Sequence, residues 1–116
     1  MQQDTRQLVI SQLSYNNTLL TQIDSDLGKI ISMNPNLSDP LTLIDNFDYN
    51  KLECMFIDSL YQRTRVIIEQ TRKLIYLVNK YINDDSKLKN ALDIHLKSAN
   101  NTLLKIQPFY KRYDYY

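Results

Sequence analysis

The sequence predicts an all-α protein, an antiparallel bundle of three long helices with a packed proline-containing linker and a tyrosine-rich tail. Three observations predict this fold. Apolar residues recur at three- and four-residue steps in three long segments. Gly28 is the only glycine, which disfavours tight β-hairpins. Asn, Asp and Pro gather between the segments, where helices are expected to end. The 116 residues fit one helical domain covering 1–116.

The first helix is expected at about residues 4–33, with Asp4 or Thr5 as its N-cap. Polar residues interrupt its apolar pattern at Tyr15-Asn16-Asn17, where we expect the helix to be weakest. Two prolines and several Asn and Asp residues then break the helix after Met33. The linker keeps enough apolar residues to pack across the bundle. The apolar positions are Val9, Leu13, Leu20, Ile23, Leu27 and Ile30 in the helix, and Leu41, Leu43, Ile44 and Phe47 in the linker.

The second helix, at about residues 50–82, carries the strongest helical pattern and an unusually wide apolar face. Its main row comprises Leu52, Phe56, Leu60, Ile67, Leu74, Val78 and Tyr81. A second row widens the face to more than half the circumference, which indicates contacts on more than one side. Because two neighbouring helices are expected to cover only part of this face, the second row is a predicted interaction or oligomer surface. It consists of Ile57, Ile68, Ile75 and Ile82.

The third helix is expected at about residues 86–107, with an N-cap in the turn Asn83-Asp84-Asp85-Ser86. Pro108 is expected to end it. The tail, residues 108–116, holds four of the nine tyrosines, and Tyr is enriched in interfaces. We expect Tyr110 and Tyr113 to contact a partner. The helix's apolar row is Leu88, Leu92, Leu96, Ala99, Leu103 and Ile106.

The composition argues against most catalytic and ligand-binding chemistries. One histidine and one cysteine build neither a catalytic triad nor a zinc site, and we expect His95 and Cys54 to be structural. We therefore expect no enzyme activity, metal, cofactor or small-molecule substrate. A net charge of +1 argues against a nucleic-acid module driven by charge, so any nucleic-acid contact is expected to be indirect. The sequence shows neither a signal peptide nor a membrane span, and an intracellular location is expected.

Arg63 is the unusual residue of the second helix. On a helical wheel it falls between Leu60 and Ile67 in the apolar row, while Arg65 faces outward. An arginine on a core face is either paired or reaches out past the bundle edge. Asp24 lies in the apolar row of the first helix at a compatible height in an antiparallel arrangement. The alternatives are a structural polar pair of Asp24 with Arg63, and an Arg63 that extends to solvent.

The second helix also carries a short motif, Tyr61-x-Arg63-x-Arg65, within LECMFIDSLYQRTRVIIEQ. This stretch resembles the central helix of the Sld-five-type subunit of the GINS replication complex, and Glu69 falls near that family's acidic residue. The first helix, the linker and the third helix are similar to the family's helical domain in order and length. The resemblance implies a non-catalytic scaffold of the replicative helicase assembly, with the other GINS subunits, the MCM ring and its cofactor as partners.

The residues favour a protein that works by binding protein partners or further copies of itself. One alternative to the replication scaffold is a small viral or microbial helical modulator that binds a host protein, such as an apoptosis-regulator-like protein presenting a groove to a helix. Another is a subunit of a different multiprotein assembly. An enzyme is disfavoured because the groups that most active sites use are not clustered.

Overall fold

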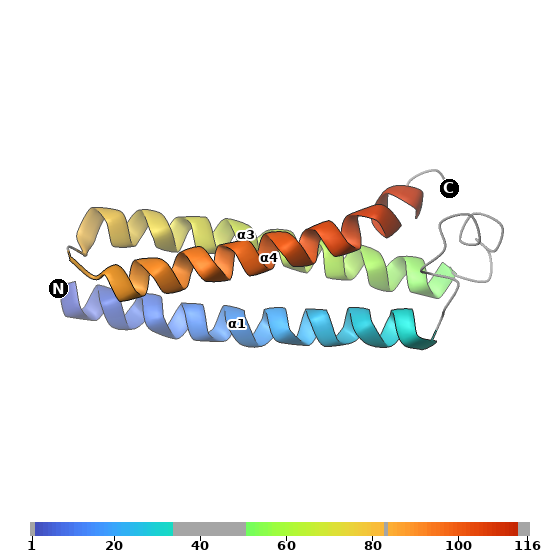
Figure 1. Cartoon of the computed structure of the whole chain (residues 1–116), viewed down its shortest axis with the longest axis horizontal. Coiled ribbons are helices and arrows are strands. Elements are labelled where there is room, and N and C mark those ends of the chain that lie inside the picture. Colours follow the sequence, from blue (N-terminus) through green and yellow to red (C-terminus); the bar gives the residue numbers. More distant parts are fainter. Residues whose placement is uncertain (1, 34–50, 83, 114–116) are drawn as a thin grey trace.

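The computed structural model describes residues 2–33, 51–82 and 84–113, without the side chains of residues 2, 30–31, 33, 51–55 and 108–113. Within these residues every regular element is a helix: α1 spans Gln2–Met33, α3 Lys51–Tyr81 and α4 Ser86–Tyr113. Figure 1 shows the three helices side by side, with α3 antiparallel to α1 and α4, in a bundle whose longest dimension is 56 Å. The predicted all-α antiparallel bundle is confirmed.

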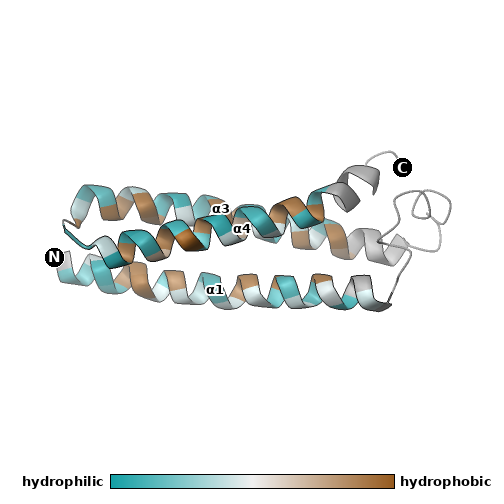
Figure 2. Cartoon of the chain, viewed as in Figure 1, coloured by the Kyte–Doolittle hydropathy of each residue, from teal (hydrophilic) through white to brown (hydrophobic). Residues whose placement is uncertain are grey.

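The core positions follow one spacing on all three helices. Buried residues alternate at three- and four-residue steps, which is the 3.5-residue repeat of helices that pack knobs into holes. Figure 2 shows the resulting alternation of hydrophobic and hydrophilic residues along each helix. The core rows are 9, 13, 16, 20, 23 and 27 on α1, 57, 60, 64, 67, 71, 74 and 78 on α3, and 88, 92, 95, 99, 102 and 106 on α4.

Polar residues divide this core into two apolar clusters. The turn-proximal cluster, next to the α3–α4 turn, contains Val9, Leu13, Leu74, Val78, Ile82, Leu88 and Leu92. The turn-distal cluster contains Leu20, Ile23, Leu27, Ile57, Leu60, Ile67, Ile68, Ala99 and Ile106. Between them each helix places one buried polar residue, Asn16, Thr71 or His95, and we call these three the polar layer. The helix α1 is continuous through Tyr15-Asn16-Asn17, and Asn16 occupies a core position there.

The second apolar row of α3 belongs to the core, and its predicted exposure is wrong. Ile57, Ile68 and Ile82 are buried, and Ile75 is half-buried against the turn-proximal cluster. The reason is that α3 packs against both α1 and α4, so its two neighbours together cover an arc wider than half a circumference. Ile57, Ile68 and Ile82 are therefore part of the interior and not an exposed surface, and Ile75 lies at its edge.

The α3–α4 turn is held by a carboxylate with two partners. Asp84 adopts a left-handed backbone with φ of 62°, a conformation that Asp tolerates better than most residues. Asp85 then caps α4 by accepting a hydrogen bond from the Leu88 N–H at 3.1 Å. Its second carboxylate oxygen forms an ion pair with Arg6 Nε of α1 at 2.7 Å. The predicted N-cap is confirmed, and it also joins α1 to the turn.

The expectation that the third helix ends at Pro108 is wrong. Pro108 does not end α4, which continues to Tyr113. A proline inside a helix removes one backbone hydrogen bond and bends the axis, but the helix can resume beyond it. The linker, residues 34–50, and the side chains of Tyr110, Tyr113 and Cys54 lie outside the described part of the chain.

Candidate interaction groove

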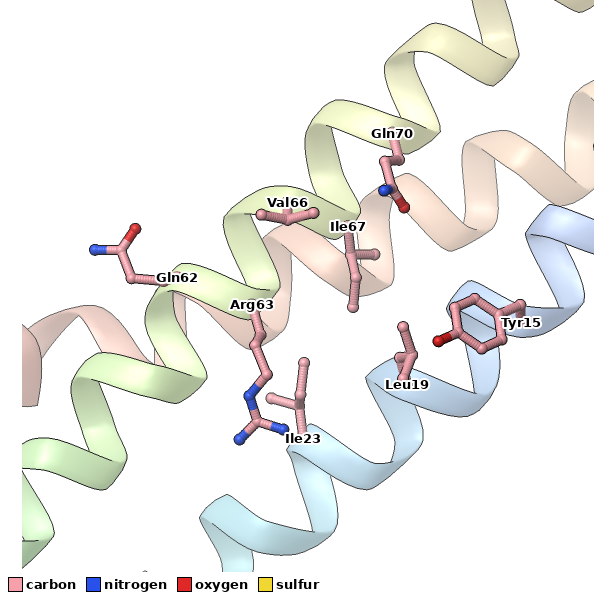
Figure 3. A pocket seen from close by; sticks show the side chains of 8 residues that line it. All are labelled: Tyr15, Leu19, Ile23, Gln62, Arg63, Val66, Ile67 and Gln70. Carbon is pink, nitrogen blue, oxygen red and sulfur yellow. The ribbon is translucent and has the colours of Figure 1, made fainter.

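A groove with mostly apolar lining lies between α1 and α3, and we call it the α1–α3 groove. Its volume is about 360 Å³. Figure 3 shows Arg63 and Ile67 of α3 and Leu19 and Ile23 of α1 pointing into the space between the two helices. The helix α1 contributes Tyr15, Leu19 and Ile23, and α3 contributes Gln62, Arg63, Val66, Ile67 and Gln70.

The floor and the rim of this groove differ in burial. Ile23 and Ile67 form the floor and are 1% and 2% exposed, because both belong to the turn-distal cluster. Tyr15 and Val66 on the rim are 59% and 52% exposed, although each offers a large apolar surface. A lining of aliphatic and aromatic groups with a few polar ends is typical of surfaces that bind other apolar groups.

The rows that flank the groove extend beyond it at both ends. Leu8 lies one heptad before Tyr15 on α1 and is 64% exposed. Phe56 lies one heptad before Arg63 on α3 and is 59% exposed. Since residues seven apart share a helix face, these side chains continue the rim along the bundle. Exposed apolar side chains are therefore spaced along the direction of the helices.

Arg63 supplies the only formal charge among the residues that line the groove. Its side chain is exposed and reaches past Ile23 toward α1 (Figure 3). Its Nε donates a hydrogen bond of 3.4 Å to the Ser59 carbonyl, near the long limit for such a bond. Within the described residues the ion pair is that of Arg6 with Asp85, and Arg63 forms none. The alternative in which Arg63 extends from the bundle edge is the one that the structure shows.

The predicted pair of Asp24 with Arg63 is wrong. Asp24 Oδ1 instead accepts a hydrogen bond of 2.7 Å from the Thr102 hydroxyl of α4. Asp24 flanks the core row of α1 on the side of α4, whereas Leu19 and the groove lie on the side of α3. A helical wheel gives the angular position of a residue around its helix axis but not the handedness of the bundle, which decides the helix that each flank faces. The pairing could therefore not be derived from the sequence.

The residues of the Tyr61-x-Arg63-x-Arg65 motif point in different directions. Tyr61 is half-buried and packs against the turn-distal cluster. The guanidinium of Arg65 lies 5.9 Å from the centroid of the Tyr61 ring, within the range of a cation–π interaction. Both arginines are exposed, but only Arg63 lines the groove. The motif thus anchors one ring and presents two cations on separate faces of α3.

The polar layer places His95 inside the bundle. Asn16 and His95 are 79 residues apart, like Arg6 and Asp85, and the pair of Asp24 with Thr102 is 78 apart. Because α1 and α4 run in the same direction, this constant offset puts Asn16 and His95 at the same height. Neither ring nitrogen of His95 has a hydrogen-bond partner among the described residues. Burial lowers the pKa of His95, since desolvation penalises the imidazolium.

Other features of the described residues provide no second site. They contain no group of three His, Cys, Asp or Glu side chains placed to hold a metal ion. None of the helices in that part of the chain is long and apolar enough to cross a membrane. A shallow depression on α1 has mostly hydroxyl and amide side chains, and a space of about 120 Å³ lies between α3 and α4 beside Val78 and Leu92.

Residue spacing contains a partial signal for the groove. Leu8 and Tyr15 are one heptad apart and lie off the core row, and so do Phe56 and Arg63. Comparison of the chain with protein-family models, curated proteins and solved structures gives no significant match.

Proposed function

We propose that this protein is a non-catalytic helical interaction module that binds a protein partner through the α1–α3 groove. The observation that carries the proposal is the contrast between the buried floor and the exposed apolar rim of the groove. Exposed apolar side chains that gather along a concavity typically mark a contact surface. In a larger assembly this chain would hold α1 and α3 at a fixed separation and so present the groove to the partner.

A scaffold subunit of a GINS-type replication complex is the specific form of this proposal. It is supported by the resemblance at Tyr61, Arg63 and Arg65 and by the three-helix order that the bundle shares with the expected domain. Its partners would be sister subunits, and nucleic acid would be contacted only indirectly. A groove between two helices equally suits the alternative of a small modulator that binds a host helix.

Site-specific photo-crosslinking tests whether the groove is the contact surface. A photoreactive phenylalanine analogue replaces Tyr15 on the groove rim or, as the control, Tyr76 on the same bundle. The two tyrosines are 59% and 61% exposed, so accessibility alone does not separate them. We expect an adduct with one defined protein from position 15 and none with that protein from position 76.

The adduct is then identified and the complex rebuilt from purified components. Val66→Glu places a charge on the rim and is expected to weaken the complex at least about tenfold, since a charge on an apolar contact must be desolvated. Tyr76→Glu is expected to leave it unchanged. Equal effects of the two variants, or equal crosslinking from both positions, would contradict the groove as the binding site.

A further inference from the structure

We infer that the partner inserts an amphipathic helix into the α1–α3 groove and that this helix carries a carboxylate that meets Arg63. The inference rests on the proposed function and specifies the chemistry of the partner. Its basis is the charge and the shape of the groove, and both are set by residues whose positions the structure describes.

The shape of the groove favours a helix. It lies between two antiparallel helices, and the exposed apolar residues beside it are spaced along the helix axes, with Phe56 and Val66 on α3 and Leu8 and Tyr15 on α1. A helix laid parallel to α1 and α3 would complete a four-helix arrangement and insert residues spaced i, i+3/i+4 and i+7 between the rims. The 14 residue steps from Phe56 to Gln70 correspond to about 21 Å of helix at about 1.5 Å per residue.

The charge of the groove favours an acidic residue at one position. Arg63 is the only charged lining residue, and its present partner is a single carbonyl at 3.4 Å. A helix that covers the groove would remove water from this guanidinium, and a buried cation needs a carboxylate to offset its desolvation. Gln62 and Gln70 provide neutral polar groups on either side. One acid among apolar residues is therefore the complementary pattern.

A carboxylate of this chain is a competitor for Arg63. Asp26 lies one heptad after Leu19 and is half-buried on α1. It lines the polar outer face of α1 and forms no ion pair with Arg63 within the described residues. Asp26 does not line the groove, so an acid on a bound helix would not have to displace it.

A second copy of the chain fits the groove less well than a foreign helix. In a two-fold dimer each copy presents the same surface, so two concave grooves would face each other and two Arg63 side chains would approach. If a different convex face of a second copy entered the groove, the contact would not close and would repeat into filaments. A helix from another protein avoids both problems.

The test uses a library of single helices about 18 residues long, displayed on one fixed scaffold and selected against the purified full-length chain. We expect the selected helices to share apolar residues at i, i+3/i+4 and i+7 and one Asp or Glu at a constant position. Selection against Arg63→Glu is expected to replace that acid by Lys or Arg. Circular dichroism of Arg63→Glu should match the parent, because Arg63 is exposed.

A charge-swap cycle with synthetic peptides gives the quantitative result. The acidic peptide should bind the parent about tenfold or more tightly than its Lys version, and Arg63→Glu should reverse that order. Asp26→Asn should leave the preference in place, and Val66→Glu should weaken both peptides. A peptide preference that is independent of residue 63, or a library that yields no helix dependent on Val66, would overturn the inference.

Sedimentation tests whether a second copy of the chain, rather than a foreign helix, occupies the groove. If the parent chain forms a dimer or filament that Val66→Glu dissociates, a second copy fills the groove and the inference is wrong. A protein crosslinked at position 15 that binds through a non-helical segment, or through a helix without an acid opposite Arg63, would also overturn it. In that case the proposed function would stand, because the groove would still be the contact surface.

Discussion

The interfaces of α1 with α4 and with α3, which we call its two seams, are built differently. Against α4, α1 is held by two polar links near its ends, Arg6 with Asp85 and Thr102 with Asp24, each at 2.7 Å. Against α3, its contacts pass from the buried Ile23 to a groove with exposed apolar rims. Directional polar links fix the height of α1 on one side. The other side keeps an apolar surface that a partner can cover.

The difference shows how a small bundle can specify one arrangement and still present a binding surface. Hydrogen bonds and ion pairs require defined geometry, so links separated by 79 and 78 residues are compatible with only one register of α1 on α4. Apolar contacts are tolerant of small shifts. A groove lined by such contacts can adjust to a partner without loss of the register that the opposite seam sets.

The largest expected effect separates the floor of the groove from its rim. Ile23→Ala removes buried methyl groups from the turn-distal cluster and should lower the free energy of unfolding by about 2–5 kcal/mol. Val66→Ala on the exposed rim should change it by less than about 0.5 kcal/mol. Denaturant unfolding of both variants measures this. Similar losses would mean that the rim is part of the core, and the two seams would then be alike.

The second prediction concerns the pH dependence of stability and the polar layer. The lowered pKa of His95 means that the unfolded chain binds the proton more tightly than the folded chain. The contribution of His95 is therefore present in full above the unfolded pKa of about 6.5 and is lost as the pH falls toward the folded pKa. Unfolding free energy measured between about pH 7.5 and 5 should decrease on acidification.

His95→Leu tests this assignment. It should abolish most of that pH dependence and raise stability at neutral pH by about 1–3 kcal/mol, because the two ring nitrogens lack partners among the described residues. The exposed acids and bases of the bundle stay the same in both proteins, which makes the parent the matched control. An unchanged slope between the two would show that other groups carry the pH dependence.

The fold was largely accessible from the sequence, for a physical reason. A repeat of three and four residues needs only local spacing, so the segments around Leu20, Leu74 and Leu92 are recognisable without tertiary information. The turn before Ser86 was also readable, since Asp at an N-cap position satisfies backbone N–H groups of the same segment.

The site depended on information that local spacing does not contain. The partner of Asp24 is set by the handedness of the bundle, which a helical wheel does not give. The sequence alone places Ile57 and Ile68 on an interaction surface, because it does not show how wide an arc of α3 two neighbouring helices cover. Asn16 and His95 occupy core positions that a search for apolar residues passes over. Tertiary packing, rather than propensity, decides each of these.

The third prediction probes the polar seam. Thr102→Val preserves the shape of a buried side chain but removes the hydroxyl that donates to Asp24, and should cost about 1.5 kcal/mol. Thr64→Val is the matched control, because the Thr64 hydroxyl is buried on α3 and donates to Leu60 of its own helix. Removal of the Thr64 hydroxyl breaks no hydrogen bond between helices and should change stability little.

A double-mutant cycle of Thr102→Val with Asp24→Ala isolates the link itself. The two changes should be less destabilising together than the sum of their separate effects, since either one already breaks the hydrogen bond. Additive effects would mean that the hydrogen bond contributes nothing to the register, and the distinction between the two seams would rest on Arg6 and Asp85 alone.

The smallest effect is expected from a change that touches neither seam. Gly28 lies in the interior of α1, is exposed, and has no atom within 4 Å of the position that a Cβ would occupy. Gly28→Ala should therefore stabilise the chain by about 0.5–1 kcal/mol through the helix propensity of α1. Ser25→Ala, three residues earlier on an exposed position, should give a smaller gain and serves as the control.

Hydrogen exchange of Gly28→Ala should show slower amide exchange in α1 and unchanged exchange in α3 and α4 if α1 opens from the bundle independently. Equal slowing in all three helices would show that α1 opens only with the whole bundle, so that its apolar seam is held as firmly as its polar one.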